Sequence, residues 1–298
     1  MKYTGERMIP SHDKGVLVYG EHIVRYQASA TLVKNKIVLD IASGSGYGTK
    51  ILADSGAKKV YGVDISKEAI EYAKKNYNAK NIEYRVGDAA EIPLEDNSMD
   101  VVVSFETIEH VPKYEAFMKE ICRVLKSDGV LIVSTPNDEE YPEGNEYHVH
   151  EFEIDEFKQL IKSNFKNHEL YYQGAYVSSG VFAKTGFEKE WTNNVNLVKA
   201  IEQPSKKVVY LTAVCSNGAL PVLEPIVSLA APWNDRGHAE YIRGFENKIE
   251  AQENEINNLK NEIDATKSEI NNMRSSKSWR YTEILRKAKH RLNRNDKQ

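Results

Sequence analysis

Short runs of β-branched and other apolar residues alternate with helix-like amphipathic segments between residue 37 and about residue 215. The predicted strands are 37–41, 59–63, 82–86, 100–105, 129–135, about 168–173 and 207–214, and the predicted helices are 47–54, 67–77, 114–126 and 154–162. Such alternation is typical of a parallel sheet. The pattern therefore predicts an α/β fold, with a Rossmann-like, doubly wound sheet of seven strands whose last strand is antiparallel.

The chain is predicted to contain a leading segment and a main domain. Residues 1–36 are expected to form a leading helical segment, either a lid over the cofactor or a plain surface helix, and 37–240 to form the main domain. Within it, residues 174–205 show little strand or helix signal and predict a cap or substrate loop. The pair Asp128-Gly129 is expected to end the helix 114–126 and to start the next strand.

A different pattern begins at residue 242, where isoleucine recurs every seven residues. The repeat is Ile242, Ile249, Ile256, Ile263 and Ile270, and the positions three later are Phe245, Gln252, Leu259, Thr266 and Met273. Pairs of opposite charge five residues apart accompany it: Lys248/Glu253, Glu255/Lys260, Glu262/Lys267 and Glu269/Arg274. One amphipathic helix docked on its own domain would explain the isoleucines but not these pairs, which do not touch within a helix. Residues 241–274 therefore predict a parallel coiled coil, as a dimer or trimer.

Composition and charge narrow the setting of the protein. The chain has 298 residues, 28% of them charged, and its net charge of −4 argues against nonspecific nucleic-acid binding. The two cysteines lack the spacing of metal ligands, which favours a reducing cytoplasm. Neither the first residues nor the proline-broken stretch 219–233 resembles a signal or membrane-spanning segment.

The last 24 residues, 275–298, carry eight Lys/Arg and two Asp/Glu. Apolar residues on one side of this tail suit an anionic membrane surface or the acidic groove of a partner. A disordered, solubilising end is the alternative. The predicted location is the cytoplasm, with peripheral attachment to the inner face of the cell membrane as an option.

Three glycines at alternate positions, Gly44, Gly46 and Gly48, follow the first predicted strand. Backbone of this kind lets a ligand approach closely. A dinucleotide fingerprint would need glycine at position 49, which is threonine, and the lysine of a phosphate-binding loop is missing. The loop therefore predicts a nucleoside site without a pyrophosphate, which points to S-adenosylmethionine.

Acidic residues accompany the first three predicted strands. Asp40 is placed to orient the amino group of the cofactor, Asp64 to accept both ribose hydroxyls, and Asp88 to accept from the adenine amino group. Since the carboxyl ends of the strands form the ligand crevice of an open α/β sheet, three acids in this order favour binding over solvated turns.

Residues 37–136 resemble class I S-adenosylmethionine-dependent methyltransferases. The motifs are Val38-Leu39-Asp40-Ile41-Ala42-Ser43-Gly44-Ser45-Gly46, Gly62-Val63-Asp64-Ile65-Ser66, Gly87-Asp88-Ala89, Phe105-Glu106-Thr107-Ile108-Glu109-His110-Val111 and Leu125-Lys126-Ser127-Asp128-Gly129-Val130-Leu131. The resemblance implies that Gly44 and Gly46 contact the methionine moiety, Asp64 the ribose, and Asp88 and Ala89 the adenine. It implies that Phe105 and Glu106 lie at the reactive side. Further implied cofactor contacts are Ala42, Ile65 and Tyr26.

Methyl transfer to a hydroxyl needs a base, because the hydroxyl loses its proton as it attacks. His110, with Glu106 nearby, follows the fourth strand, and His148 and His150 follow the fifth. These four residues are the predicted catalytic groups. The histidines could instead only start helices and orient loops. The histidines with Glu106 or Glu109 could instead ligate a divalent metal, but the spacing gives no support for this alternative and no metal is predicted.

Two segments outside the cofactor motifs point to the methyl acceptor. Gly5-Glu6-Arg7, Glu21-His22 and Arg25-Tyr26 are similar to the leading segments of methyltransferases encoded with surface-polysaccharide enzymes. The start of the tail, residues 276–286, resembles a tail of bacterial glycan-assembly proteins. Together they imply O-methylation of a sugar in a cell-surface polysaccharide. The alternatives are a quinone-type or small-metabolite methyltransferase, and a scaffold whose coiled coil organises other enzymes.

Overall fold

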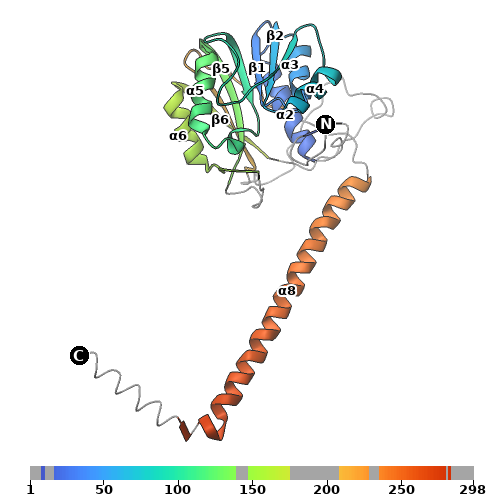
Figure 1. The fold of residues 1–298 in the computed structure, drawn as a ribbon, viewed down its shortest axis with the longest axis vertical. Coiled ribbons are helices and arrows are strands. Elements are labelled where there is room, and N and C mark those ends of the chain that lie inside the picture. Colours follow the sequence, from blue (N-terminus) through green and yellow to red (C-terminus); the bar gives the residue numbers. More distant parts are fainter. Residues whose placement is uncertain are drawn as a thin grey trace, which may run out of the picture. The chain divides into compact units, whose positions relative to one another are not determined.

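The computed structural model describes residues 8–10, 17–138, 147–174, 208–227, 235–279 and 281–282. Two compact units divide the chain, residues 1–232 and 233–298. The first unit contains a mixed sheet and the helices that cover it, and the second contains one long helix (Figure 1).

The first unit is built on a seven-stranded sheet with the order β3-β2-β1-β4-β5-β7-β6. Its strands are β1 (Ile37–Ile41), β2 (Lys59–Asp64), β3 (Ile82–Val86), β4 (Met99–Ser104), β5 (Leu125–Pro136), β6 (Asn167–Gln173) and β7 (Tyr210–Ser216). Strands β1 to β5 are parallel, and β7 runs antiparallel to both of its neighbours, β5 and β6. The predicted sheet, with its last strand reversed, is confirmed. The strand order changes direction between β1 and β4, where sheets of this kind bind ligands.

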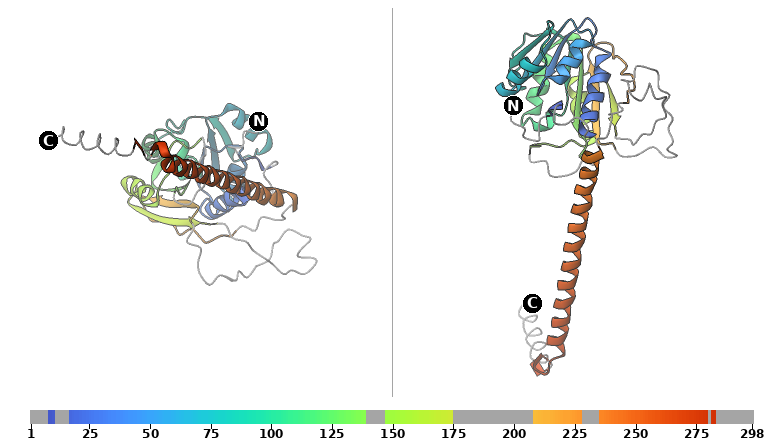
Figure 2. Two further views of the ribbon diagram at one scale, coloured as in Figure 1. Left: turned by 90° about the horizontal axis from the view of Figure 1, so that it is seen from below. Right: turned by 90° about the vertical axis from the view of Figure 1, so that its right-hand side faces the viewer.

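Helices cover both faces of this sheet (Figure 1, Figure 2). Helices α2 (Leu17–Ala30), α3 (Tyr47–Asp54) and α4 (Lys67–Asn76) pack on one face, and α5 (Tyr114–Val124) and α6 (Ile154–Asn164) on the other. A short 3₁₀ helix, η1 (Ile108–His110), lies between β4 and α5.

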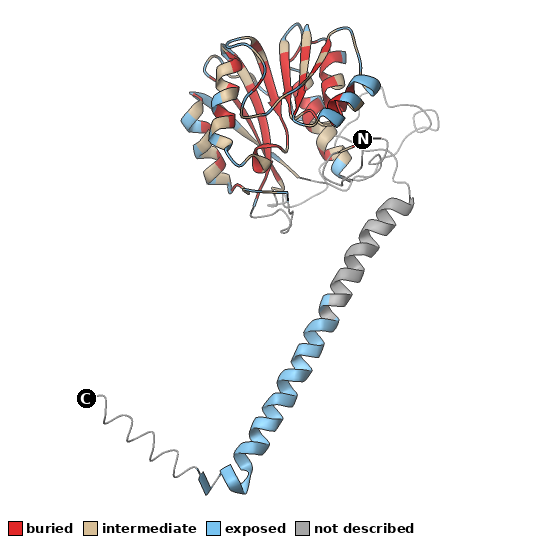
Figure 3. Cartoon of the chain, viewed as in Figure 1, coloured by how far each residue is buried: buried red, intermediate tan, exposed pale blue. Residues whose placement is uncertain are grey.

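Alternate residues of the central strands supply the two cores. In β4, Val101 and Val103 join the core under α2, α3 and α4, whereas Val102 joins the core under α5 and α6. All three side chains are almost fully buried, as Figure 3 shows for the central strands in general. A strand that is buried on both faces reads as a continuous apolar run, which is why these strands are recognisable in the sequence.

Strand β5 begins earlier than predicted. Helix α5 ends at Val124 and the strand starts at once at Leu125, instead of after Asp128-Gly129. Leu125 is buried and pairs with Met99, and the register then shifts before Val101. The turn-forming pair therefore lies inside an irregular strand, because burying Leu125 outweighs the local turn signal.

The second unit is helix α8 (Asp235–Ser275), which spans the residues of the predicted coiled coil. Its described side chains are exposed (Figure 3). The leading helix predicted within 1–36 corresponds to α2. The cap predicted over 174–205 and the tail beyond residue 282 fall almost entirely outside the described residues. Among the helices that the structure describes, none combines the length and hydropathy needed to cross a bilayer.

Candidate active site

The loop after β1 forms the floor of the candidate site. Gly44 and Gly46 have positive φ angles of 54° and 89°, as does Ala42 at 59°. A Cβ atom on Gly46 would lie 2.5 Å from Ala73, and one on Gly48 would clash with the Tyr26 ring, so both glycines are required by packing within the protein. Among the described residues, a Cβ on Gly44 would meet no atom within 4 Å. Gly44 is therefore the glycine whose backbone faces open space, where a ligand can approach.

Asp64 ties this loop to the end of β2. Its Oδ2 accepts a hydrogen bond from the Gly44 amide at 2.8 Å, and its Oδ1 accepts one from the Ser66 amide at 2.8 Å. A carboxylate oxygen can accept more than one hydrogen bond, so both oxygens keep capacity for the hydroxyls of a ribose. The next side chain, Ile65, is 65% exposed, which is unusual for isoleucine and offers an apolar surface beside the carboxylate.

Asp40 is buried below the loop. Tyr26 donates a hydrogen bond to its Oδ1 at 3.1 Å, and Thr49 donates one to its Oδ2 at 2.6 Å. Burial raises the pKa of Asp40 to about 7, against the lowering effect of these hydrogen bonds. The Tyr26 ring also packs edge-on against Phe105, at 4.9 Å between centroids. Asp40 thus braces Tyr26 and the loop, and its contact with the cofactor amino group remains a prediction.

The other predicted cofactor residues follow neighbouring strands. Asp88 and Ala89 come after β3, and the exposed Asp88 accepts a hydrogen bond from the Ala90 amide at 2.8 Å. Phe105 and Glu106 follow β4. Because β1 to β4 are parallel neighbours, their carboxyl ends share one edge of the sheet. The structure therefore brings the predicted cofactor residues to that edge, as expected.

Helix α2 adds a residue that sequence reasoning did not assign to the cofactor. Arg25 is only 4% exposed, and its Nη1 donates to Gln173 at 2.9 Å and lies 3.8 Å from Glu106. Its Nε and Nη2 are buried and have no hydrogen-bond partner among the described residues. Glu21, on the same face, is buried and accepts a hydrogen bond from Tyr210 at 2.9 Å. Because Glu21 and Arg25 are buried, the alternative prediction of a plain surface helix is wrong for this face. The sequence signal for a buried polar face was the spacing of Glu21 and Arg25, four residues apart and next to apolar residues.

Glu106 has an unusual backbone conformation for its residue type. Its φ of 49° lies in the left-handed region, which costs free energy for a non-glycine residue and recurs at functional sites. Ser134 on β5 donates to its Oε1 at 2.7 Å. The conformation and the hydrogen bond hold the carboxylate at the end of β4, beside Arg25.

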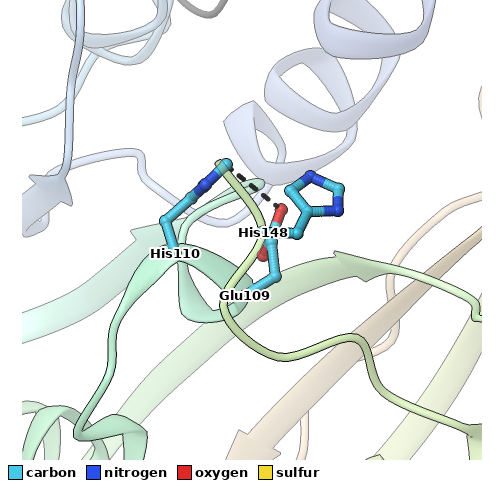
Figure 4. A group of neighbouring side chains, drawn as sticks. All are labelled: Glu109, His110 and His148. Atoms are coloured by element: carbon cyan, nitrogen blue, oxygen red, sulfur yellow. Dashed lines mark ion pairs between the residues drawn. The ribbon is translucent and has the colours of Figure 1, made fainter. Parts of the chain in front are cut away.

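The histidines divide into a pair and a single residue. The rings of His110 and His148 lie 4.9 Å apart, beside the buried Glu109 (Figure 4). Burial and the nearby charge of Glu106 raise the pKa of Glu109 well above its usual range. His150 instead bonds Glu156 at 2.8 Å and packs against Phe152. The structure thus brings two of the three predicted histidines together and turns the third away from them.

Comparisons with known proteins agree with this arrangement. Residues 39–133 match a protein family described as a methyltransferase domain. This part of the first unit is therefore similar to a methyltransferase domain. A probable S-adenosylmethionine-dependent methyltransferase of Mycolicibacterium smegmatis is 35% identical to the chain over 165 residues, which are 54% of this chain and 63% of that protein. The chain spans about three fifths of the length of the first curated relatives it matches.

The names of other similar proteins specify different methyl acceptors. A ubiquinone biosynthesis O-methyltransferase of Neisseria meningitidis is 36% identical over 111 residues, which are 35% of this chain and 46% of that protein. A solved Thermotoga maritima structure, an S-adenosylmethionine-dependent methyltransferase described as a possible histamine N-methyltransferase, covers 71% of this chain and 97% of its own. Its TM-score is 0.51 at 20% identity, so this likeness supports the fold alone.

Proposed function

We propose that the chain is an S-adenosylmethionine-dependent O-methyltransferase that methylates a sugar hydroxyl of a bacterial cell-surface polysaccharide. The observation that carries the proposal is the polar end of β4, where Glu106, His110 and His148 gather beside the cofactor edge. Such side chains suit an acceptor that carries hydroxyl groups. The resemblance of the leading segment and the tail to glycan-assembly proteins supports a sugar in particular.

The residues at the strand ends fit S-adenosylmethionine. The open space above Gly44 can accommodate the methionine moiety, and Asp64 and Asp88 can accept from the ribose and the adenine. Two nitrogens of Arg25 have no hydrogen-bond partner in the part of the chain that the structure describes, and a carboxylate could accept from them. When bound, the cofactor supplies an electrophilic methyl group on a sulfonium.

The side chains around the cofactor edge then have to position the acceptor and take its proton. In-line transfer depends mainly on positioning and on the exclusion of water. The acceptor hydroxyl must also lose its proton during the attack. His110 and His148 are the candidate bases. His150 is a weaker candidate because Glu156 and Phe152 hold its ring elsewhere.

A second candidate function is methylation of a quinone-type or other small phenolic acceptor. The 36% identity over 111 residues to a protein named as a ubiquinone biosynthesis O-methyltransferase favours it. The two functions differ in the acceptor and not in the donor, so one assay separates them.

The proposal is tested by following the transfer of a labelled methyl group from S-adenosylmethionine. Nucleotide sugars, lipid-linked glycans and hydroquinones would be offered in parallel to the full chain. The expected result is a methyl ether on a glycan acceptor and no product from hydroquinones. Product from hydroquinones alone would contradict the sugar assignment and favour the second candidate.

We also propose that α8 pairs with a second copy of this chain as a parallel coiled coil. Apolar side chains lie along its described part, each between 40% and 56% exposed: Ile256, Leu259, Ile263, Ile270 and Met273. They follow the heptad spacing, and opposite charges flank them at the positions that face each other across a parallel coil. A second copy would bury this seam, and the alternative role as a scaffold is compatible with it.

Ile263→Asp is expected to convert the oligomer to a monomer, because it places a carboxylate in the seam of every helix. The association should weaken at least about 100-fold, measured by analytical ultracentrifugation. Ser268→Asp adds the same charge on the outer face of the helix and should leave the mass unchanged. A monomeric wild-type chain, or equal weakening by both variants, would refute the coiled coil.

We also propose that the protein is cytoplasmic and that its basic tail binds a membrane surface or a partner protein. Both cysteines are free thiols, which agrees with a reducing compartment. Most of the tail lies outside the described residues.

A further inference from the structure

Three side chains from two separate segments meet at the end of β4. Glu109 and His110 belong to η1, and His148 belongs to the segment before α6 (Figure 4). One ligand atom from each lies within 4.8 Å of the others. Such a spacing would allow the three side chains to hold one metal ion, and no other group in the described part of the chain meets it. The Glu109 Oε1 and the His110 Nε2 are 3.9 Å apart. Methyl transfer needs a single base and does not by itself explain a carboxylate with two imidazoles.

The main chain fixes the two segments against each other. The amides of Val149 and His150 donate to the backbone carbonyl of Glu109 at 2.9 and 3.1 Å. These bonds hold the segment containing His148 directly over η1. The three side chains therefore meet in a preformed arrangement, as a ligand site requires.

Hydrogen bonds also set the tautomers of both imidazoles. The His110 Nδ1 bonds the backbone carbonyl of Tyr147 at 2.8 Å, and the His148 Nδ1 bonds the Glu151 carboxylate at 2.7 Å. Because the carbonyl and the ionised carboxylate can only accept, each Nδ1 carries a proton, and in a neutral imidazole this leaves the lone pair on Nε2. Such pairing of the second nitrogen is how proteins orient histidines that ligate metals.

Glu109 supplies the second independent indication. Its side chain is fully buried, and its Oε1 has no hydrogen-bond partner among the described residues. Thr135 donates only a long hydrogen bond of 3.3 Å to the other oxygen. A buried carboxylate with an unpartnered oxygen is costly, and a cation beside it removes that cost.

We propose that Glu109, His110 and His148 bind one divalent transition-metal ion. Two imidazoles and one carboxylate favour ions such as Mn²⁺, Fe²⁺, Co²⁺ or Zn²⁺ over the oxygen-seeking Mg²⁺ and Ca²⁺. Ligand atoms at about 2.1 Å from one metal lie about 3 to 3.5 Å apart. The Glu109–His110 separation of 3.9 Å, and the 4.8 Å within which all three ligand atoms lie, require these atoms to move closer together when a metal binds. The spacing along the sequence gave no sign of this site because residues 109 and 148 meet only through the fold.

Three protein ligands leave coordination positions open. If the proposed methyl transfer holds, an acceptor hydroxyl bound there would be more acidic, and Glu106 or solvent could take its proton. This part of the inference rests on the proposed function. Metal binding itself does not, so the two can be tested apart.

The test is a titration of the full chain, stripped of metal by a chelator, with Mn²⁺ and with Co²⁺. Electron paramagnetic resonance measures free Mn²⁺, and visible absorption reports nitrogen ligation of Co²⁺. We expect one ion per chain. Glu109→Gln and His148→Gln, which keep size and polarity, should each weaken binding at least tenfold, by analogy with the tenfold or greater loss that even outer-shell changes cause. His150→Gln, a neighbouring histidine outside the group, should leave the affinity unchanged.

Circular dichroism establishes that each variant is folded, and His110→Gln replaces any variant that is not. Absence of saturable Mn²⁺ and Co²⁺ binding, or equal affinity in the wild type and the variants, would overturn the site. The binding of S-adenosylhomocysteine is measured in the same preparations. Metal binding without nucleoside binding would refute the proposed function and leave the metal site standing, and the reverse result would refute only the metal site.

Discussion

Asp64→Asn is expected to lower the affinity for S-adenosylhomocysteine by at least about 100-fold, measured by isothermal titration calorimetry. The carboxylate accepts from the Gly44 and Ser66 amides, and we propose that it also accepts from both ribose hydroxyls. Hydrogen bonds to a charged group contribute about 1.5–3 kcal/mol each. Two of them correspond to about 100-fold or more in affinity. The side-chain NH₂ of asparagine would also face a backbone N–H or a ribose hydroxyl, each of which needs an acceptor.

Asp100→Asn is the matched control for this substitution. Asp100 accepts from the Ile37 amide at 2.7 Å and from Lys126 at 2.6 Å, and so it makes the same kind of structural contact. It lies at the opposite, amino-terminal end of the strands. Both variants should lose thermal stability, but only Asp64→Asn should lose nucleoside binding. Equal binding by the wild type and Asp64→Asn would refute the assignment of the cofactor edge.

The sheet was predictable because its strands are buried on both faces. Runs such as Val101-Val102-Val103 feed two cores at once and leave a continuous apolar signal in the sequence. The start of β5 was not predictable in this way. There the pairing of Leu125 with Met99, a contact across the fold, competes with the local turn signal of Asp128-Gly129.

The glycine loop shows how far a motif can be interpreted from sequence. Its three glycines look equivalent at alternate positions, and all were natural candidates for ligand contact. The structure assigns them different roles, because Ala73 and Tyr26 occupy the space beside Gly46 and Gly48. Gly44 alone of the three faces open space. That distinction depends on which side chains α2 and α4 bring against the loop.

The contacts of Arg25 and of Glu109 could not be read from sequence for a related reason. Arg25 on α2 reaches Gln173 on β6, and the main chain of Glu109 bonds the segment that carries His148. These partners are far apart in the chain and follow no period. They come together only in the folded chain, in which β4 is the central strand of the sheet.

Arg25 is the second residue for which we expect a large effect. The buried Arg25 guanidinium stacks on the Tyr210 ring at 4.6 Å, but two of its nitrogens have no hydrogen-bond partner among the described residues. That is unfavourable unless a ligand completes the hydrogen bonds. Its position beside Glu106, and next to Tyr26 above Asp40, places it near the methionine end of the proposed cofactor site. We propose that the amino-acid carboxylate of S-adenosylmethionine pairs with Arg25.

Arg25→Met keeps much of the length of the side chain and removes the charge. It is expected to weaken the binding of S-adenosylhomocysteine about 30-fold or more, since truncating one partner of a buried charge pair costs at least about 2 kcal/mol. Binding of 5′-methylthioadenosine, which lacks the carboxylate, should change little. The ratio of the affinities for S-adenosylhomocysteine and 5′-methylthioadenosine is measured in the wild type and in Arg25→Met. The change in this ratio isolates the interaction between Arg25 and the carboxylate, as in a double-mutant cycle. Arg85→Met, at an arginine that pairs with Glu83 on β3, controls for loss of a positive charge. If Arg25→Met weakens both ligands by the same factor, Arg25 supports the fold of the site and does not bind the carboxylate.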